Sequence, residues 1–137
     1  MATIVTVETN VVITQNGVSV VDRTFTKEYE VTDKIEASYY LDASNPKITL
    51  CVKGTDLAAG GVDGGPITDP MVLPLSTIRG FAIESELTVE VNLGTVDAPV
   101  PVADGHLSVA QCELLLIEIT RNDTANGAIS LVVWGDR

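Results

Sequence analysis

The sequence predicts an all-β fold, an antiparallel β-sandwich or jelly roll of about eight or nine strands. Valine, isoleucine and threonine dominate, whereas the straight-chain helix formers are scarce, and β-branched side chains favour pleated strands. Polar and apolar residues alternate in segment after segment, with turn-forming residues about every 8–14 positions. With 137 residues, 45% of them apolar, the chain is expected to form one domain over 1–137.

The first strand is expected at residues 3–15, where Val5, Val7, Val11 and Ile13 share one face. The following Asn16-Gly17 tolerates positive φ at both positions, which predicts a type I′ hairpin turn. The alternation and the turn signals place the remaining strands at 18–22, 27–32, 35–42, 47–53, 78–93, 113–120 and 128–134.

Two local features qualify this assignment. A helix over 108–116 is the alternative there, because Ser108 and Gln111 have the spacing of a capping box; the β-branched residues just beyond it favour a strand. Asn126-Gly127 is expected to form a second positive-φ turn.

The glycine-rich stretch 54–70, GTDLAAGGVDGGPITDP, is expected to be a long surface loop. It contains no Lys or Arg and no following GK[ST], so it does not suit a phosphate. Calcium is the alternative ligand, because Asp56, Asp63 and Asp69 could supply oxygens. Their spacing of seven and six residues is unlike that of a compact calcium loop, and the sequence predicts no metal site.

The same loop is predicted to contact another protein subunit. Leu57, Val62 and Ile67 make it too apolar for a solvated linker, and loops of this length tend to be functional. Pro99 and Pro101 cannot donate to a ladder, so their segment belongs at a sheet edge. These five residues are the predicted interaction loop residues.

The charge balance argues against several partners. Eight basic and nineteen acidic residues give a formal charge of −11, which repels nucleic-acid phosphates and anionic membranes. The N-terminal residues show no basic region or cleavage site, so no signal peptide is expected.

The sequence shows no catalytic constellation and implies no cofactor. His106 is the one histidine, and general-base or metal chemistry would need partners for it. Tyr40 and Trp134 have the parity of outward-facing side chains and are candidate interface anchors, or alternatively platforms for a sugar. Cys51 and Cys112 are expected to be free, buried thiols.

Two segments, STIRGFAIESELTVEVNLG (76–94) and LLLIEITRNDTANGAISLVVWGD (114–136), resemble the paired β-segments of small bacteriophage virion proteins of the decoration or cement class. The resemblance implies a non-enzymatic structural role in a capsid or tail and a location in the virion; without it, the cytoplasm is expected. The expected partners are further copies, with a homotrimer favoured, and a larger protein lattice such as a capsid. The alternative function is a carbohydrate- or ligand-binding β-sandwich module.

Overall fold

A computed structural model describes residues 3–61, 65–67, 70–93, 100–102, 105–109, 112–122 and 124–137. These residues form strands, turns and bends and contain no helix, which confirms the all-β prediction. The strands are β1 (Thr3–Gln15), β2 (Val18–Val31), β3 (Asp33–Leu41), β4 (Lys47–Cys51), β5 (Pro70–Val72), β6 (Thr77–Ser85), β7 (Val89–Leu93), β8 (Val100–Val102), β9 (His106–Val109), β10 (Leu116–Arg121) and β11 (Gly127–Asp136).

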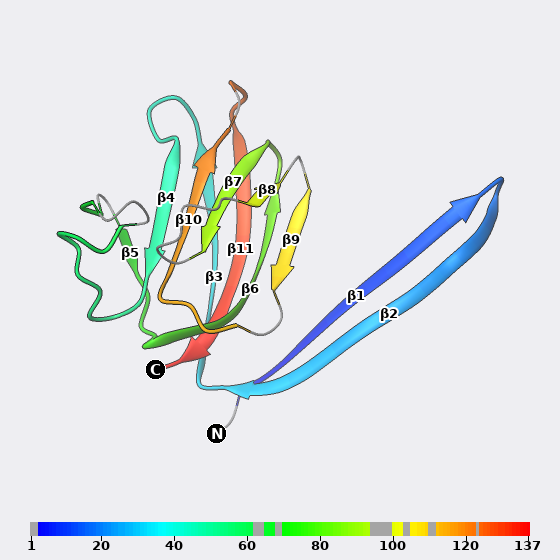
Figure 1. The fold of residues 1–137 in the computed structure, drawn as a ribbon, viewed down its shortest axis with the longest axis horizontal. Helices are drawn as coiled ribbons and strands as arrows, with labels where there is room; N and C mark the ends of the chain where they lie inside the picture. Colours follow the sequence, from blue (N-terminus) through cyan, green and yellow to red (C-terminus); the bar gives the residue numbers. More distant parts are fainter. Residues whose placement is uncertain are drawn as a thin grey trace.

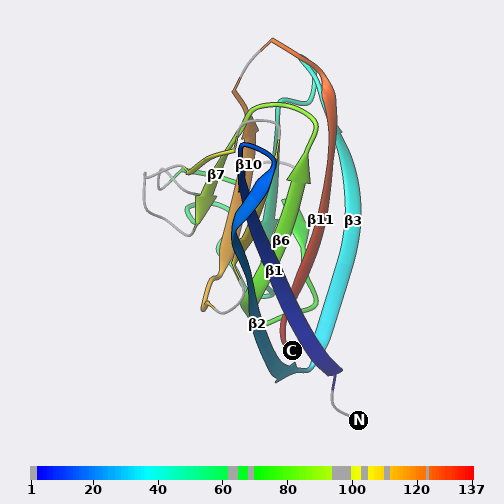
Figure 2. The same cartoon turned by 90° about the vertical axis from the view of Figure 1, so that its right-hand side faces the viewer.

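Nine of these strands form a sandwich of two sheets (Figures 1 and 2). One sheet has the order β5-β4-β10-β7-β8 and the other β3-β11-β6-β9; their pairs are antiparallel except β4–β5. The core lies between the sheets, where Leu50, Ile117, Phe81 and Leu131 are buried. These residues lie on the inward side of the predicted alternation.

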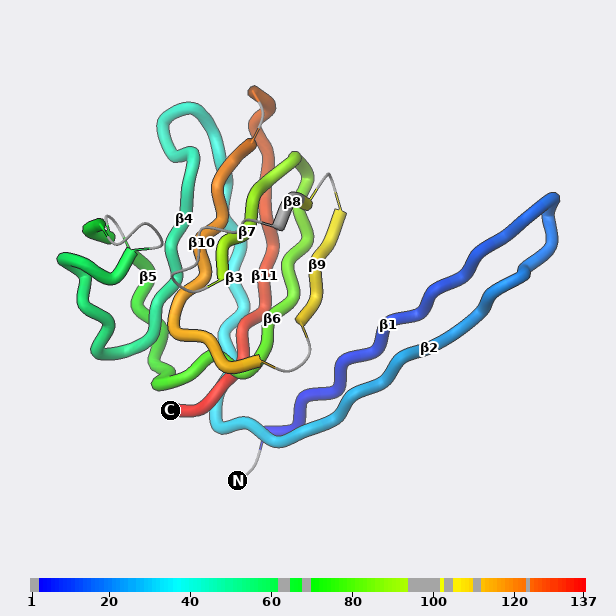
Figure 3. Tube along the Cα trace, viewed as in Figure 1, coloured from blue at the N-terminus to red at the C-terminus, as the bar shows by residue number. Residues whose placement is uncertain are grey.

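The hairpin β1–β2 forms a separate two-stranded sheet that projects from the sandwich, as the tube in Figure 3 shows. Asn16 and Gly17 join its strands with φ of 52° and 77°, and Gln15 pairs with Val18. Positive φ at both central residues confirms the predicted type I′ turn. The pairing then runs to Thr3 and Val31, with one bulge beside Ile13.

Three sequence predictions of strand limits were wrong. The segments 18–22 and 27–32 belong to one strand, β2. The prediction divided it because an exposed hairpin tolerates polar residues on both faces, so the residues between the two segments show no apolar alternation. The segment 78–93 is two strands, β6 and β7, in different sheets. The chain crosses between them near Leu87, whose backbone N–H donates to the Ser85 hydroxyl.

Short edge strands were missed, and one turn was misassigned. The sequence prediction did not include β5, β8 or β9, which have three, three and four residues, too few for alternation to show. The Asn126-Gly127 prediction was wrong: neither residue has positive φ. Gly127 begins β11, and a Cβ there would lie 3.1 Å from Leu87 Cδ2, so close packing explains that glycine.

Candidate functional site: the hairpin arm and the adjoining sheet face

The hairpin, residues 3–31, is the most exposed apolar element among the described residues; we call it the arm. It carries eight of the twelve large apolar side chains that are exposed there. They are Ile4, Val11, Val12, Ile13, Val18, Val20, Val21 and Phe25. Exposed apolar residues gathered on one element mark an interaction surface.

The pairing register separates the charges of the arm onto its two faces. Residues that oppose each other across the ladder share a face. Val11 therefore lies with Arg23 on one face, and Val12 lies with Asp22 on the other. Between Ile4 and Glu30, the basic face consists of Val5, Val7, Thr9, Val11, Ile13, Val21, Arg23, Phe25, Lys27 and Tyr29. The acidic face consists of Ile4, Thr6, Glu8, Asn10, Val12, Asp22, Thr24, Thr26, Glu28 and Glu30.

Each face has its own stabilising contacts. On the acidic face, the Asn10 amide donates to Thr24 Oγ1 at 2.8 Å and to Asp22 Oδ1 at 3.3 Å. On the basic face, the Arg23 guanidinium lies 4.9 Å from the centre of the Phe25 ring, a cation–π geometry. The side-chain hydrogen bonds that link the two strands therefore lie on the acidic face, and the basic face remains available for contact.

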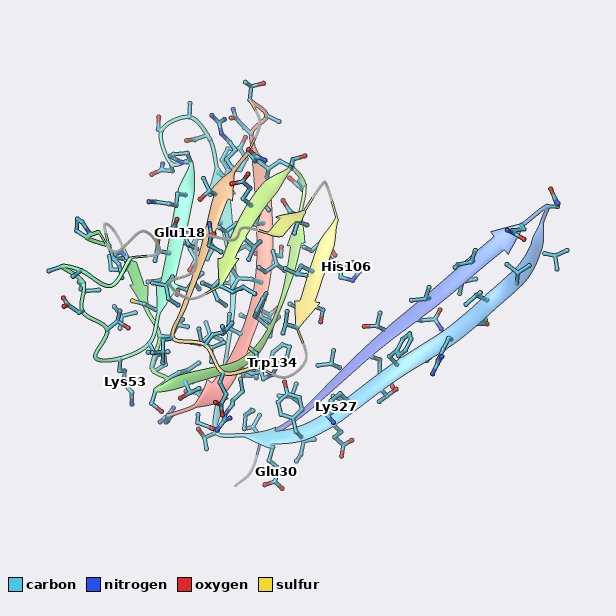
Figure 4. All side chains as sticks on the ribbon, in the orientation of Figure 1. Lys27, Glu30, Lys53, His106, Glu118 and Trp134 are labelled. Atoms are coloured by element: carbon cyan, nitrogen blue, oxygen red, sulfur yellow. The ribbon has the colours of Figure 1, made fainter. Side chains whose placement is uncertain are left out.

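The root of the arm is fixed to the sandwich by Trp134 on β11. The indole N–H donates to the Tyr29 hydroxyl, and the two rings lie 6.5 Å apart at 53° (Figure 4). Gly80 lies opposite Trp134 in the ladder, where a Cβ would overlap the indole. Trp134 is consequently only 4% exposed, although it faces outward from the core.

A second set of contacts holds the junction between β2 and β3. The Thr32 backbone N–H donates to the Gly135 carbonyl at 3.0 Å, and Arg137 N–H donates to Thr32 Oγ1 at 2.7 Å. Asp33 accepts from the Lys34 N–H and from Arg137 Nε, and these hydrogen bonds, that of Lys34 first, lower the pKa of Asp33. The last strand and the residue after it thus fix the junction to the sandwich.

The outer face of the β3-β11-β6-β9 sheet lies beside the arm and is lined by small side chains. Ala82, Ser130 and Val132 form its floor between two carboxylates, Glu36 on β3 and Glu84 on β6. Two adjoining hollows of about 380 and 480 Å³ lie on this face. We call this surface the trough, lined by Lys34, Glu36, Ser38, Ala82, Glu84, His106, Ser108, Ser130 and Val132.

The trough continues beneath the arm. The larger hollow is bounded on one side by Thr3–Thr9 of β1 and on the other by Ala82, Val132 and Trp134. At the root of the arm, Tyr29 on the basic face meets Trp134, while farther along β1 residues of both faces line the hollow. The larger hollow therefore lies between the arm and the outer face of the four-stranded sheet.

His106 lies outside hydrogen-bond reach of Ser130 in the trough. It is exposed on the edge strand β9 and pairs across the ladder with Glu84, which in turn pairs with Ser130. Ser130 is therefore two strands away from His106, about 10 Å at the usual strand spacing. A nucleophile and its base need direct hydrogen-bond contact.

The predicted interaction loop residues are separated in space. Ile67 is half-buried against Cys51 and Leu116 on the outer face of the five-stranded sheet, and its N–H donates to the Leu57 carbonyl at 2.8 Å. Leu57 itself is 42% exposed. Pro101 pairs with Glu90 on the edge strand β8, as expected for an edge, while Val62 and Pro99 lie outside the described residues.

The two aromatic candidates differ in exposure. Tyr40 is 59% exposed at the far end of the outer face, whereas Trp134 is covered by the root of the arm. Trp134 therefore anchors an element of its own chain. The sequence prediction did not find that the arm is a separate, exposed sheet. Its strands of 13 and 14 residues are long against the usual five or six.

The cysteines and the aspartates of the loop were also candidates. Cys51 is buried and Cys112 half-buried, both are free, and burial raises the pKa of each thiol. Asp56 accepts from the Ala58 N–H at 3.0 Å, while Asp63 and Asp69 lie outside the described residues. Within the described part of the chain, no three acids, histidines or cysteines gather as metal ligands would.

Comparison with known proteins gives no relative for this chain. No family model matches it, and neither a curated protein nor a solved structure matches it. In the described residues, no helix has the length and apolar character needed to cross a membrane.

Proposed function

We propose that the chain is a non-enzymatic assembly subunit that associates with further copies of itself through the arm. The observation that carries this proposal is the arm's apolar surface, which projects from the sandwich without a covering layer. An isolated two-stranded hairpin is marginally stable in water. Contact with another subunit would bury these side chains and stabilise the ribbon.

The charge distribution supports a second copy as the partner. Residues 32–137 carry six basic and fifteen acidic residues, a formal charge of −9. The basic face of the arm has two cations and no acid. One chain therefore presents both a cationic apolar ribbon and an anionic body that complements it.

The resemblance to decoration proteins extends the proposal to a viral capsid or tail, where the chain would sit on a larger protein lattice. The carbohydrate-binding alternative has less support. Trp134 is covered by Tyr29 and cannot stack on a sugar, which leaves Tyr40 as the exposed member of that pair.

Self-association is tested by analytical ultracentrifugation over a range of concentrations. We expect the parent chain to form an oligomer, and Phe25→Asp, which places a charge on the basic face, to shift it toward monomer. Thr26→Asp is the matched control, because it adds the same charge at the next residue on the acidic face. Circular dichroism of each variant establishes that the strands remain folded.

A monomeric parent at every concentration would contradict the proposal, as would equal effects of the two substitutions. The viral location has its own test: mass spectrometry of gradient-purified particles of the virus that encodes the chain should detect it as a stoichiometric component. Its absence from such particles would remove the capsid or tail role and leave self-association to stand by itself.

A further inference from the structure

We propose that the basic face of one copy's arm lies in the trough of a second copy. This inference rests on the proposed function and names the surface that receives the arm. It commits to a second copy because the arm and the trough of one chain match in size, shape and charge.

The dimensions agree. Residues 7–15 and their partners form a ribbon about 30 Å long at 3.4 Å per residue. The trough runs along β3, which has nine residues and therefore a similar length of about 30 Å. It crosses four strands, about 14 Å between the outermost axes, so a two-stranded ribbon fits within its width.

The shapes are complementary. The floor of the trough has Ala82, Ser130 and Val132, which leave a shallow hollow instead of a filled surface. The basic face of the arm presents larger groups, among them Ile13, Val21 and Phe25, which is 53% exposed. Large side chains facing small ones interdigitate as layers in a protein core do.

The charges are also complementary. Glu36 and Glu84 flank the floor of the trough on the solvent side, and Arg23 and Lys27 project from the basic face. The opposite face of the arm carries Glu8, Asp22, Glu28 and Glu30 and would be repelled. The trough also contains Lys34, but its two carboxylates outnumber this one cation. Charge therefore selects which side of the ribbon enters the trough.

The contact continues one that already exists within the chain. At the root, Tyr29 on the basic face lies against Trp134 on this same sheet face. Beyond the root, the arm diverges from the sandwich (Figure 1), and the larger hollow lies between the two. A partner's arm laid in the trough would extend the same pairing of basic face and outer sheet face beyond Trp134.

Charge reversal on each side tests the pairing. In the full chain, Arg23→Glu with Lys27→Glu reverses the arm, and Glu36→Lys with Glu84→Lys reverses the trough. We expect each double variant to raise the dissociation constant of self-association at least about tenfold. A chain with all four substitutions should return to within about threefold of the parent, because both surfaces are reversed together.

The controls reproduce the charge changes elsewhere. Glu28→Lys with Glu30→Lys makes the same change as the trough variant but on the acidic face of the arm. Lys47→Glu with Lys53→Glu makes the same change as the arm variant, but at exposed sites of the body. Both should associate as the parent does. If the trough variant also associates as the parent does while Phe25→Asp does not, the docking inference is overturned and the proposed function stands.

Disulfide trapping tests the same contact without charge. A pool with Phe25→Cys is mixed with an isotope-labelled pool with Ser38→Cys, Ser108→Cys or Ser130→Cys, each with Cys112→Ser to remove the half-buried thiol. We expect mass spectrometry to find labelled–unlabelled disulfides for Phe25→Cys and far fewer for the neighbouring Thr26→Cys. Equal yields would overturn docking by the basic face, and so would no cross-link in an oligomer that Phe25→Asp disrupts.

Discussion

At the scale of single residues, Trp134 decides how the arm is held. Its parity on β11 points it away from the core, yet it is buried because Tyr29 covers it and Gly80 leaves room beneath it. Glycine at position 80 therefore serves close packing of an aromatic ring and not a special backbone conformation.

Gly80→Ala is expected to displace the indole and loosen the root of the arm. The added methyl overlaps the ring, and overpacking of this kind costs about 1–3 kcal/mol. The chain has one tryptophan, so its fluorescence reports this site alone, and a red shift with a lower melting temperature is expected. Ala82→Gly, two ladder positions away on the same face and without an added methyl, is the comparison. An unshifted spectrum in Gly80→Ala would contradict the packing described.

Asp33 gives the junction a pH dependence. Hydrogen bonds from the Lys34 N–H and from Arg137 lower its pKa in the folded chain, so the carboxylate contributes stability above its unfolded pKa of about 3.9. That contribution is lost as the pH falls through the lower folded pKa. Asp33→Asn should therefore be less stable than the parent near neutral pH and equal to it in strong acid, as measured by denaturant unfolding. A difference that stays constant with pH would exclude this role.

At the scale of elements, the exposed apolar surface lies mainly on the arm and not on the glycine-rich loop. The loop was predicted to be the interaction arm, but part of it lies on its own sheet through Ile67, Cys51 and Leu116. The hairpin was predicted to be part of the sandwich, and it projects instead. The interaction residues of the loop remain a prediction, while the arm has the larger exposed apolar surface.

Gly17→Val is expected to weaken the arm and leave the sandwich largely intact. A β-branched residue at φ of 77° costs about 1–3 kcal/mol, and the turn is remote from the core. Hydrogen exchange should show faster exchange of the β1 and β2 amides, with little change for β6, β10 and β11. Asn16→Asp, which still tolerates positive φ, is the control. Equal loss of protection in both parts would show that the hairpin and the sandwich unfold together.

At the scale of the whole molecule, the chain has an uneven distribution of apolar surface and charge. The sandwich has a complete core and an acidic exterior, whereas the ribbon beside it has an apolar face with two cations. A second copy that binds the folded chain would stabilise it, as any ligand stabilises the folded state to which it binds.

The melting temperature of the parent should therefore rise with protein concentration. Association removes folded monomer from the unfolding equilibrium, and the gain grows with the logarithm of concentration. Calorimetry over a hundredfold range should show the rise in the parent and in Thr26→Asp, but not in Phe25→Asp. A melting temperature independent of concentration in all three would argue against assembly under those conditions.

The all-β class, the type I′ turn at Asn16-Gly17 and the inward face of β4 could be predicted from the sequence alone. Each depends on neighbouring residues: β-branched composition, a dipeptide that tolerates positive φ, or period-2 alternation. The limits of β2, the division of 78–93 and the short edge strands could not be predicted in this way, because local alternation does not show which sheet a strand joins or where an exposed ribbon ends.

The candidate site depended on the tertiary structure still more. Alternation shows that Val5, Val7, Val11 and Ile13 share a face, but not whether a second layer covers that face. Only the pairing of β2 with β1, and of β3 with β11, reveals that no strand of the sandwich lies over it. Likewise, Trp134, Gly80 and Tyr29 are far apart in sequence and meet only because β11 pairs with β6 and carries the root of the arm. Periodicity is a local property of the chain, whereas burial is decided by what packs on each face.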